Sequence, residues 1–299
     1  MQVRRCSPDL TGAVTLTDRT EIASGVSAQV RLAIARAEFI IGIRSGARMR
    51  FSFRRGEQDS AGKGPTAAEL PDLAGAELSG LVHGKRVGGD FYQFARANER
   101  RVVFGLLDVA GDAKENRGIV EAARQTFREK APVCLGDSST NEADAMMEFC
   151  LELNASIRGA AKGVRQCAAF LGCYNEELGT VCYVNAGHTP GLLRYDSEIS
   201  ELGSTGMPLG LFSASTYEAP TVAVPVGGGL LLVSRGVVEA ARKKEEYGIE
   251  RLRQHFLASP LANAPALVKA ALDAVVEFAP DATKQNDLTA LALLRPSRN

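Results

Sequence analysis

The sequence lacks three features that would each place it in a well-defined class of protein. No apolar run reaches the roughly 18 residues that a membrane-spanning helix needs. The N-terminal MQVRRCSPDL has no apolar core of the kind found in signal peptides. Net charge is absent as well, because 35 Lys and Arg residues balance 35 Asp and Glu residues. We therefore expect a cytoplasmic protein that does not bind a membrane. We also expect no nucleic-acid partner, because a chain without net charge has no overall electrostatic field to attract one.

Paired cysteines are also absent. The six cysteines contain no CxxC pair, so the pattern of a zinc or dithiol motif is missing. Four of them lie in apolar stretches, where a cysteine behaves as a small hydrophobic residue. This use of cysteine is typical of a protein in a reducing compartment and not of one held together by disulfide bonds.

What is present is enough apolar sequence for one large domain and a small appendage, since 45% of the 299 residues are hydrophobic. Residues 21–43 have the spacing of an amphipathic helix and residues 47–55 alternate as a strand does. A polar, glycine-containing stretch ending at Pro65 follows. We expect an appendage of residues 1–65 and a main domain of residues 66–299. The N-terminal helix either forms a homodimer or packs on its own domain.

The main domain alternates between strands and helices in blocks. The pattern predicts three strands, two helices, two hairpins, a buried strand, a helix and a final strand. Their approximate residues are 77–83, 87–95, 101–109, 116–130, 142–159, 165–187, 192–202, 227–236, 264–278 and 286–295. Because the strands come in runs and do not alternate singly with helices, we expect an α+β fold or layered sandwich without parallel βαβ units.

Two aspartates next to glycines are the first candidates for chemistry. Asp90 follows Gly88 and Gly89, and Asp108 ends an apolar strand just before Gly111. A carboxylate that leaves a buried strand at a tight glycine turn is held rigidly, which suits a hard divalent cation. Each corner taken alone is equally typical of an ordinary turn.

The wider pattern resembles a known family. The segments that carry the resemblance are GGDFYQF, LLDVAGD, YVNAGHTPGLL, MPLGLF, LLLVSRGVVEA, YGIERL and NDLTALALL. In this order they resemble the stage II sporulation protein E and sigma-factor-regulating phosphatases, which belong to the metal-dependent protein Ser/Thr phosphatases of type 2C. The resemblance covers residues 70–295, and seven spaced segments are far more specific than one.

The resemblance implies a fold and a chemistry. The fold would be a β-sandwich of two antiparallel sheets flanked by helices. The family holds two Mn²⁺ or Mg²⁺ ions and the water that attacks a phosphoserine or phosphothreonine. Two cations can lower the pKa of that water and neutralise charge on the phosphoryl oxygens. The lack of a Cys or Ser nucleophile motif is therefore expected.

Carried over by position, half of the metal site matches the family. Asp90 corresponds to the aspartate of the GGD segment and Asp108 to the aspartate that bridges both metals, with the Val109 carbonyl as a further ligand. Asp287, in the segment before the last strand, completes the expected metal residues. His188 belongs to the NAGH motif, where we expect it to anchor a turn.

The other half departs from the family pattern. Ser234-Arg235-Gly236 stands where the family has Thr-Asp-Gly, and Asn286 stands in place of the first aspartate of an Asp-Asp pair. We expect one Mn or Mg ion and not two, with Arg235 in the vacated position, paired with Asp108 or Asp287. The alternative is that Arg235 points to solvent and the match is slipped by one residue.

Three functions stay open at this point. The first is a phosphatase acting on a phosphorylated regulatory protein, such as an anti-sigma-factor antagonist. The second is a pseudophosphatase that binds a signalling partner without turnover. The third is an unrelated small-molecule hydrolase or nucleotide binder, for which GKGP and GKRVGG are weak support because neither is a complete phosphate loop.

Overall fold

The computed structural model describes residues 73–84, 89–111 and 113–297. The predicted appendage of residues 1–65, with its helix and strand, lies outside the described residues, as does the proposed dimer contact.

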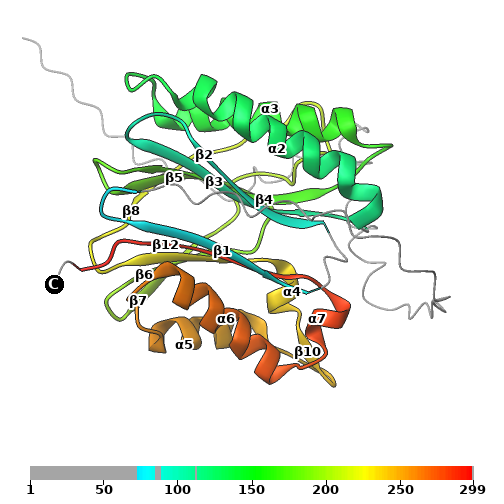
Figure 1. Ribbon diagram of the computed structural model, residues 1–299. Helices are drawn as coiled ribbons and strands as arrows, with labels where there is room; N and C mark the ends of the chain where they lie inside the picture. The colour runs from blue at the N-terminus through cyan, green and yellow to red at the C-terminus, as the bar shows by residue number, and fades with distance from the viewer. Residues whose placement is uncertain (1–72, 85–88, 112, 298–299) are drawn as a thin grey trace, which may run out of the picture. The chain divides into compact units, whose positions relative to one another are not determined.

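Two antiparallel sheets lie face to face, and a pair of helices covers the outer side of each (Figure 1). The first sheet has the order β1-β12-β9-β6-β7 and the second has the order β2-β3-β4-β5-β8. All pairings between these strands are antiparallel. The predicted α+β sandwich is therefore confirmed.

The bounds of the strands are close to those predicted for most of the domain. In the first sheet they are β1 (Glu77–His83), β12 (Leu288–Leu294), β9 (Gly229–Val233), β6 (Gly191–Tyr195) and β7 (Glu198–Leu202). In the second they are β2 (Asp90–Arg96), β3 (Arg101–Val109), β4 (Cys167–Asn175), β5 (Thr180–Ala186) and β8 (Thr221–Ala223). The tight turn between β4 and β5 uses Gly179 at φ 65°, as its sequence predicts.

The helices form the two outer layers. α2 (Ala113–Leu135) and α3 (Glu142–Ala160) cover the second sheet, while α5 (Gly248–Ala258) and α6 (Ala264–Phe278) cover the first. Short elements complete the fold: α4 (Arg235–Val238), α7 (Ala282–Gln285) and the hairpin β10 (Ala241–Arg242) and β11 (Glu245–Glu246).

Two helices, α2 and α5, differ from what the sequence predicts. The prediction ended α2 at residue 130, yet the helix continues through Pro132 to Leu135. Ala131 and Leu135 are fully buried on either side of that proline, so packing of the last turn outweighs the one backbone hydrogen bond that proline cannot make. α5 was not predicted, because it is short and only Leu252 and Phe256 on it are buried.

Apolar side chains fill three layers in the described part of the chain. The central layer lies between the sheets and includes Phe104, Leu106, Phe170, Leu230 and Leu291. One outer layer packs the second sheet against α2 and α3, and the other packs the first sheet against α5 and α6. Each strand therefore divides its residues by parity between the centre and a helix layer.

Among the described residues, no helix is long and apolar enough to cross a bilayer.

Candidate functional site

The two predicted aspartates lie on facing positions of neighbouring strands. On β3 the even-numbered Phe104 and Leu106 face the central layer, and Asp108 continues that series at the end of the strand. On β2 Phe94 faces the same layer, so the even-numbered Asp90 does too. The ladder makes Asp90 and Asp108 direct cross-strand partners. The two carboxylates therefore meet at one end of the space between the sheets.

The opposite sheet contributes polar residues by the same periodicity. Leu230 and Leu232 of β9 face the central layer and lead to Ser234. Leu291 and Leu293 of β12 do the same. Going back along β12, this parity gives Thr289 and then Asp287, both of which are buried. Polar groups of both sheets thus gather where the apolar layer ends.

The carboxyl group of Asp90 has a strongly perturbed pKa. Its pKa is raised to about 7, chiefly by burial and also by the neighbouring charges of Asp108 and Asp287, while the Ser234 and Thr289 hydroxyls act to lower it. The Thr289 hydroxyl donates to Asp90 Oδ2 over 3.2 Å. A carboxyl group held near neutrality by its surroundings is typical of functional sites, although buried structural networks also produce it.

The glycine corner at Asp90 is sterically required. A Cβ at position 89 would collide with the Val109 carbonyl oxygen and lie 2.8 Å from Asn116 Nδ2. That carbonyl accepts a hydrogen bond of 2.9 Å from the same Asn116 amide. The Val109 oxygen predicted as a metal ligand therefore already has one partner, and only its second lone pair is available.

Arg235 reaches across to the second sheet. Its Nη2 lies 3.6 Å from Asp108 Oδ2, and its Nε lies 3.8 Å from Glu239 Oε1 on the next turn of α4. Both distances are those of loose ion pairs and too long for hydrogen bonds. The Arg235 side chain is 45% exposed, so it is neither locked in place nor directed fully into solvent.

The two segments that depart from the family pattern come together in space. A Cβ on Gly236 would collide with the Asp287 carbonyl oxygen and lie 3.1 Å from the Asn286 Cβ. The Ser-Arg-Gly turn therefore packs directly on the Asn286–Asp287 backbone. Asn286 is exposed, whereas Asp287 is 4% exposed.

His188 is buried beside this cluster in a fixed tautomer. The Thr189 hydroxyl donates to the Val233 carbonyl, so the 3.0 Å contact between Thr189 Oγ1 and His188 Nδ1 requires the ring to donate. The backbone N–H of His188 donates to Asn185 Oδ1 over 2.8 Å. Burial lowers the pKa of His188 to about 4, so the ring is neutral at pH 7. These contacts are those of a turn anchor.

The carboxylates are not arranged as a complete metal cage. In the described part of the chain, no three His, Cys, Asp or Glu side chains are placed to hold an ion together. Asp90 and Asp108 are cross-strand partners, while the neighbouring residues Arg235 and Asn286 carry a guanidinium and a neutral amide. The donor set therefore fits one cation, completed by backbone oxygens or water, better than it fits two.

Sequence reasoning missed Ser234, Thr289 and Asn116. The first two could have been found by extending the strand parity past the last apolar residue of β9 and back along β12. Asn116 gives no such signal, because its contact with Val109 depends on how α2 begins.

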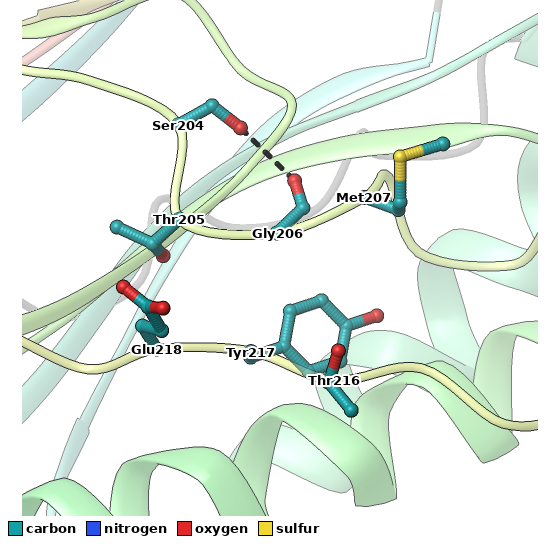
Figure 2. Close-up of a pocket in the computed structure, with 7 residues that line it drawn as sticks. All are labelled: Ser204, Thr205, Gly206, Met207, Thr216, Tyr217 and Glu218. Atoms are coloured by element: carbon teal, nitrogen blue, oxygen red, sulfur yellow. Dashed lines mark hydrogen bonds between the residues drawn. The ribbon is translucent and has the colours of Figure 1, made fainter. Parts of the chain in front are cut away.

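A pocket of about 440 Å³ lies elsewhere, between the loops that precede β8 (Figure 2). Residues 204–207 line one side and residues 216–218 line the other. The Ser204 hydroxyl donates to the Gly206 carbonyl over 3.0 Å across its rim. None of the predicted site residues lines it, so it is separate from the aspartate cluster.

Comparison with solved structures defines the class of protein. The SiaA-PP2C domain of Pseudomonas aeruginosa superposes with a TM-score of 0.60 at 17% identity, covering 72% of this chain and 84% of that one. The RsbU and RsbW domains of Rv1364c from Mycobacterium tuberculosis give 0.59 at 20% identity, over 75% and 62%. RsbX in complex with magnesium gives 0.52 at 12% identity, over 76% and 98%. The fold is that of the PP2C-type phosphatases.

The sequence identifies the family within that class. The profile described as stage II sporulation protein E (SpoIIE) matches residues 98–296. The chain belongs to this family. The phosphoserine phosphatase RsbP of Bacillus subtilis is 25% identical over 154 residues, which is 51% of this chain. The match spans only 37% of the length of RsbP.

Proposed function

We propose that residues 66–299 form a metal-dependent protein serine/threonine phosphatase-like domain whose second metal position is impaired. One observation carries the proposal: Asp90 and Asp108 are cross-strand partners at the end of the sandwich, and the Arg235 guanidinium lies 3.6 Å from Asp108. The carboxylate pair supports one metal position, and the arginine stands where another acidic ligand is expected.

Charge favours one ion over two. Asp90 and Asp108 offer the oxygen donors that Mn²⁺ or Mg²⁺ prefers. A cation bound there would neutralise charge on a phosphoryl group and lower the pKa of a bound water. A second cation would be repelled by the positive charge of Arg235. It would find in Asn286 only a neutral amide oxygen, which is a weaker ligand than a carboxylate.

The relatives support a class of substrate. RsbP is named a phosphoserine phosphatase, and the RsbU relative occurs in a structure with an RsbW domain. These relatives support a phosphorylated regulatory protein as the partner, such as an anti-sigma-factor antagonist. The Arg235 guanidinium and the Asn286 amide favour a second candidate, a pseudophosphatase that binds the same kind of partner without hydrolysing it.

The test compares the wild-type chain with the Arg235→Asp, Asn286→Asp double variant. Calorimetry with Mn²⁺ counts the ions, and turnover of a generic phosphomonoester measures activity. We expect one bound ion in the wild type and two in the double variant, with turnover rising about tenfold or more. Arg253→Asp, which disrupts an ion pair with Glu201 on the surface, controls for the charge reversal made by Arg235→Asp.

The results of these measurements distinguish a phosphatase from a pseudophosphatase. Measurable wild-type turnover with one ion supports the phosphatase, and no turnover with intact partner binding supports the pseudophosphatase. If the wild type binds two ions and is as fast as the double variant, the second site is not impaired and the proposal is wrong.

A further inference from the structure

Two hydroxyl groups of one sheet meet the carboxylate of Asp90 in the other. Thr289 Oγ1 donates to Asp90 Oδ2 over 3.2 Å, and the Ser234 hydroxyl lies near enough to Asp90 to lower the pKa of that carboxyl group. Asp90 begins β2, whereas Ser234 follows β9 and Thr289 belongs to β12. The Thr289 hydrogen bond therefore joins the two sheets at the point where the apolar central layer ends.

The two hydroxyl-bearing residues hold each other in place. The backbone N–H of Ser234 donates to the Thr289 carbonyl over 2.8 Å. The backbone N–H of Thr289 donates to Ser234 Oγ over 3.1 Å. Both residues are fully buried. Their side chains are thus fixed by the continuation of the β9–β12 ladder, and neither is free to rotate toward water.

The hydrogen-bond inventory of Ser234 leaves one proton to donate. Ser234 Oγ accepts from the Thr289 N–H, so its hydroxyl proton has two nearby acceptors. One is the Asp287 carbonyl at 3.5 Å, the outer limit for a hydrogen bond, and the other is the Asp90 carboxylate. A carboxylate is the stronger acceptor of the two.

Asp90 needs such partners because its surroundings oppose its charge. Asp108 lies directly opposite on β3, and Asp287 adds a further negative charge. Hydroxyl donors stabilise a carboxylate that is removed from water, and they restrict its rotation.

We infer that Ser234 and Thr289 are positioning residues, which act from the opposite sheet to hold the Asp90 carboxylate in the orientation that binds a divalent cation. The inference rests on the proposed role of Asp90 in metal binding. Partners that hydrogen-bond to a ligating group change metal affinity by roughly 10–100-fold when they are removed.

The test uses substitutions that differ in one hydroxyl. Thr289→Val keeps the shape and removes the donor, whereas Thr289→Ser keeps the donor. Thr126→Val is the matched control, because Thr126 is another largely buried threonine whose hydroxyl bonds only to the Ala122 carbonyl within α2. Calorimetry measures Mn²⁺ affinity, and thermal denaturation verifies folding. Carboxyl ¹³C NMR of Asp90 in the metal-free protein reports the hydrogen bond directly.

We expect Thr289→Val to weaken Mn²⁺ binding by about tenfold or more and to move the Asp90 carboxyl resonance. Thr289→Ser should keep the Mn²⁺ affinity and the Asp90 carboxyl resonance close to those of the wild type. Thr126→Val should change neither quantity. If Thr289→Val does not fold, Ser234→Ala takes its place in the same measurements.

Unchanged affinity and an unchanged carboxyl resonance in a folded Thr289→Val protein would overturn the inference. A wild-type chain that binds no Mn²⁺ would instead contradict the proposed function. In that case the carboxyl resonance alone decides whether Ser234 and Thr289 orient Asp90.

Discussion

The guanidinium of Arg235 lies 3.6 Å from the carboxylate of Asp108. Arg235 begins α4, which follows β9 of the first sheet, and Asp108 lies at the end of β3 in the second sheet, so this ion pair links the two sheets. Aspartate at this position would add a third negative charge beside Asp90 and Asp108, which only bound cations could balance. Arginine balances part of the charge without an ion. Under the proposed function, the same fold would therefore stay stable with fewer bound ions.

Removing this ion pair should have little effect on stability. Arg235→Gln is expected to change the free energy of unfolding by less than about 1 kcal/mol, because the arginine is half-exposed and its ion pairs are long. Urea denaturation of the metal-free protein measures this. A loss of several kcal/mol would show that Arg235 is a structural residue and not a substitute for a ligand.

The pKa of Asp90 predicts a pH dependence for the metal-free protein. Burial raises that pKa to about 7 from an ordinary value of 3.8, so the folded state binds more protons than the unfolded state between these values. Stability should therefore be greatest at low pH within this window and fall as the pH rises from about 4 to about 7.

Asp90→Asn removes the ionisable group and serves as the comparison. Urea unfolding at pH 5, 6, 7 and 8 should show that this variant loses less stability with rising pH than the wild type. Parallel pH profiles for the two proteins would mean that Asp90 does not titrate in this range.

The glycine corner next to Asp90 should tolerate no side chain. Gly89→Ala places a methyl group against the Val109 carbonyl and the Asn116 amide and should lower the free energy of unfolding by about 1–3 kcal/mol. Gly118→Ala in α2 is the control, since no atom lies within 4 Å of its added Cβ. It should stabilise the protein by about 0.5–1 kcal/mol. Equal effects in thermal denaturation would contradict the steric argument.

The loop between α2 and α3 is anchored by a buried arginine. Arg101 pairs with Glu142 at 2.9 Å, and its guanidinium also donates to backbone carbonyls of that loop, including Asp137 at 2.8 Å. Arg101→Ala leaves Glu142 buried without this partner and should cost about 3–5 kcal/mol.

Its neighbour Arg100 provides the matched control. The ion pair of Arg100 with Glu177 is more than half exposed on both sides, so Arg100→Ala should cost about 1 kcal/mol or less. Chemical denaturation of both variants compares them, and similar losses would refute the role given to burial.

Much of the fold could be predicted from strand parity and turn residues. In β3, for example, buried residues on both faces, a terminal aspartate and the glycine corner after it are all visible in RVVFGLLDVAG. The pattern also placed Gly179 in its turn. It failed for α5, where too few side chains are buried to give a helical repeat, and at the end of α2, where packing overrides a proline.

The candidate site divides in a similar way. The sequence by itself determined which residues carry charge at strand ends, including Asp90, Asp108 and the unusual Arg235, because alternation and glycine turns are local properties of the chain. Only the tertiary structure decided that Thr289 bonds to Asp90, 199 residues away, and that Asn286 lies against Gly236. Such contacts depend on which strands become neighbours and on how two sheets face each other, and no local pattern encodes that choice.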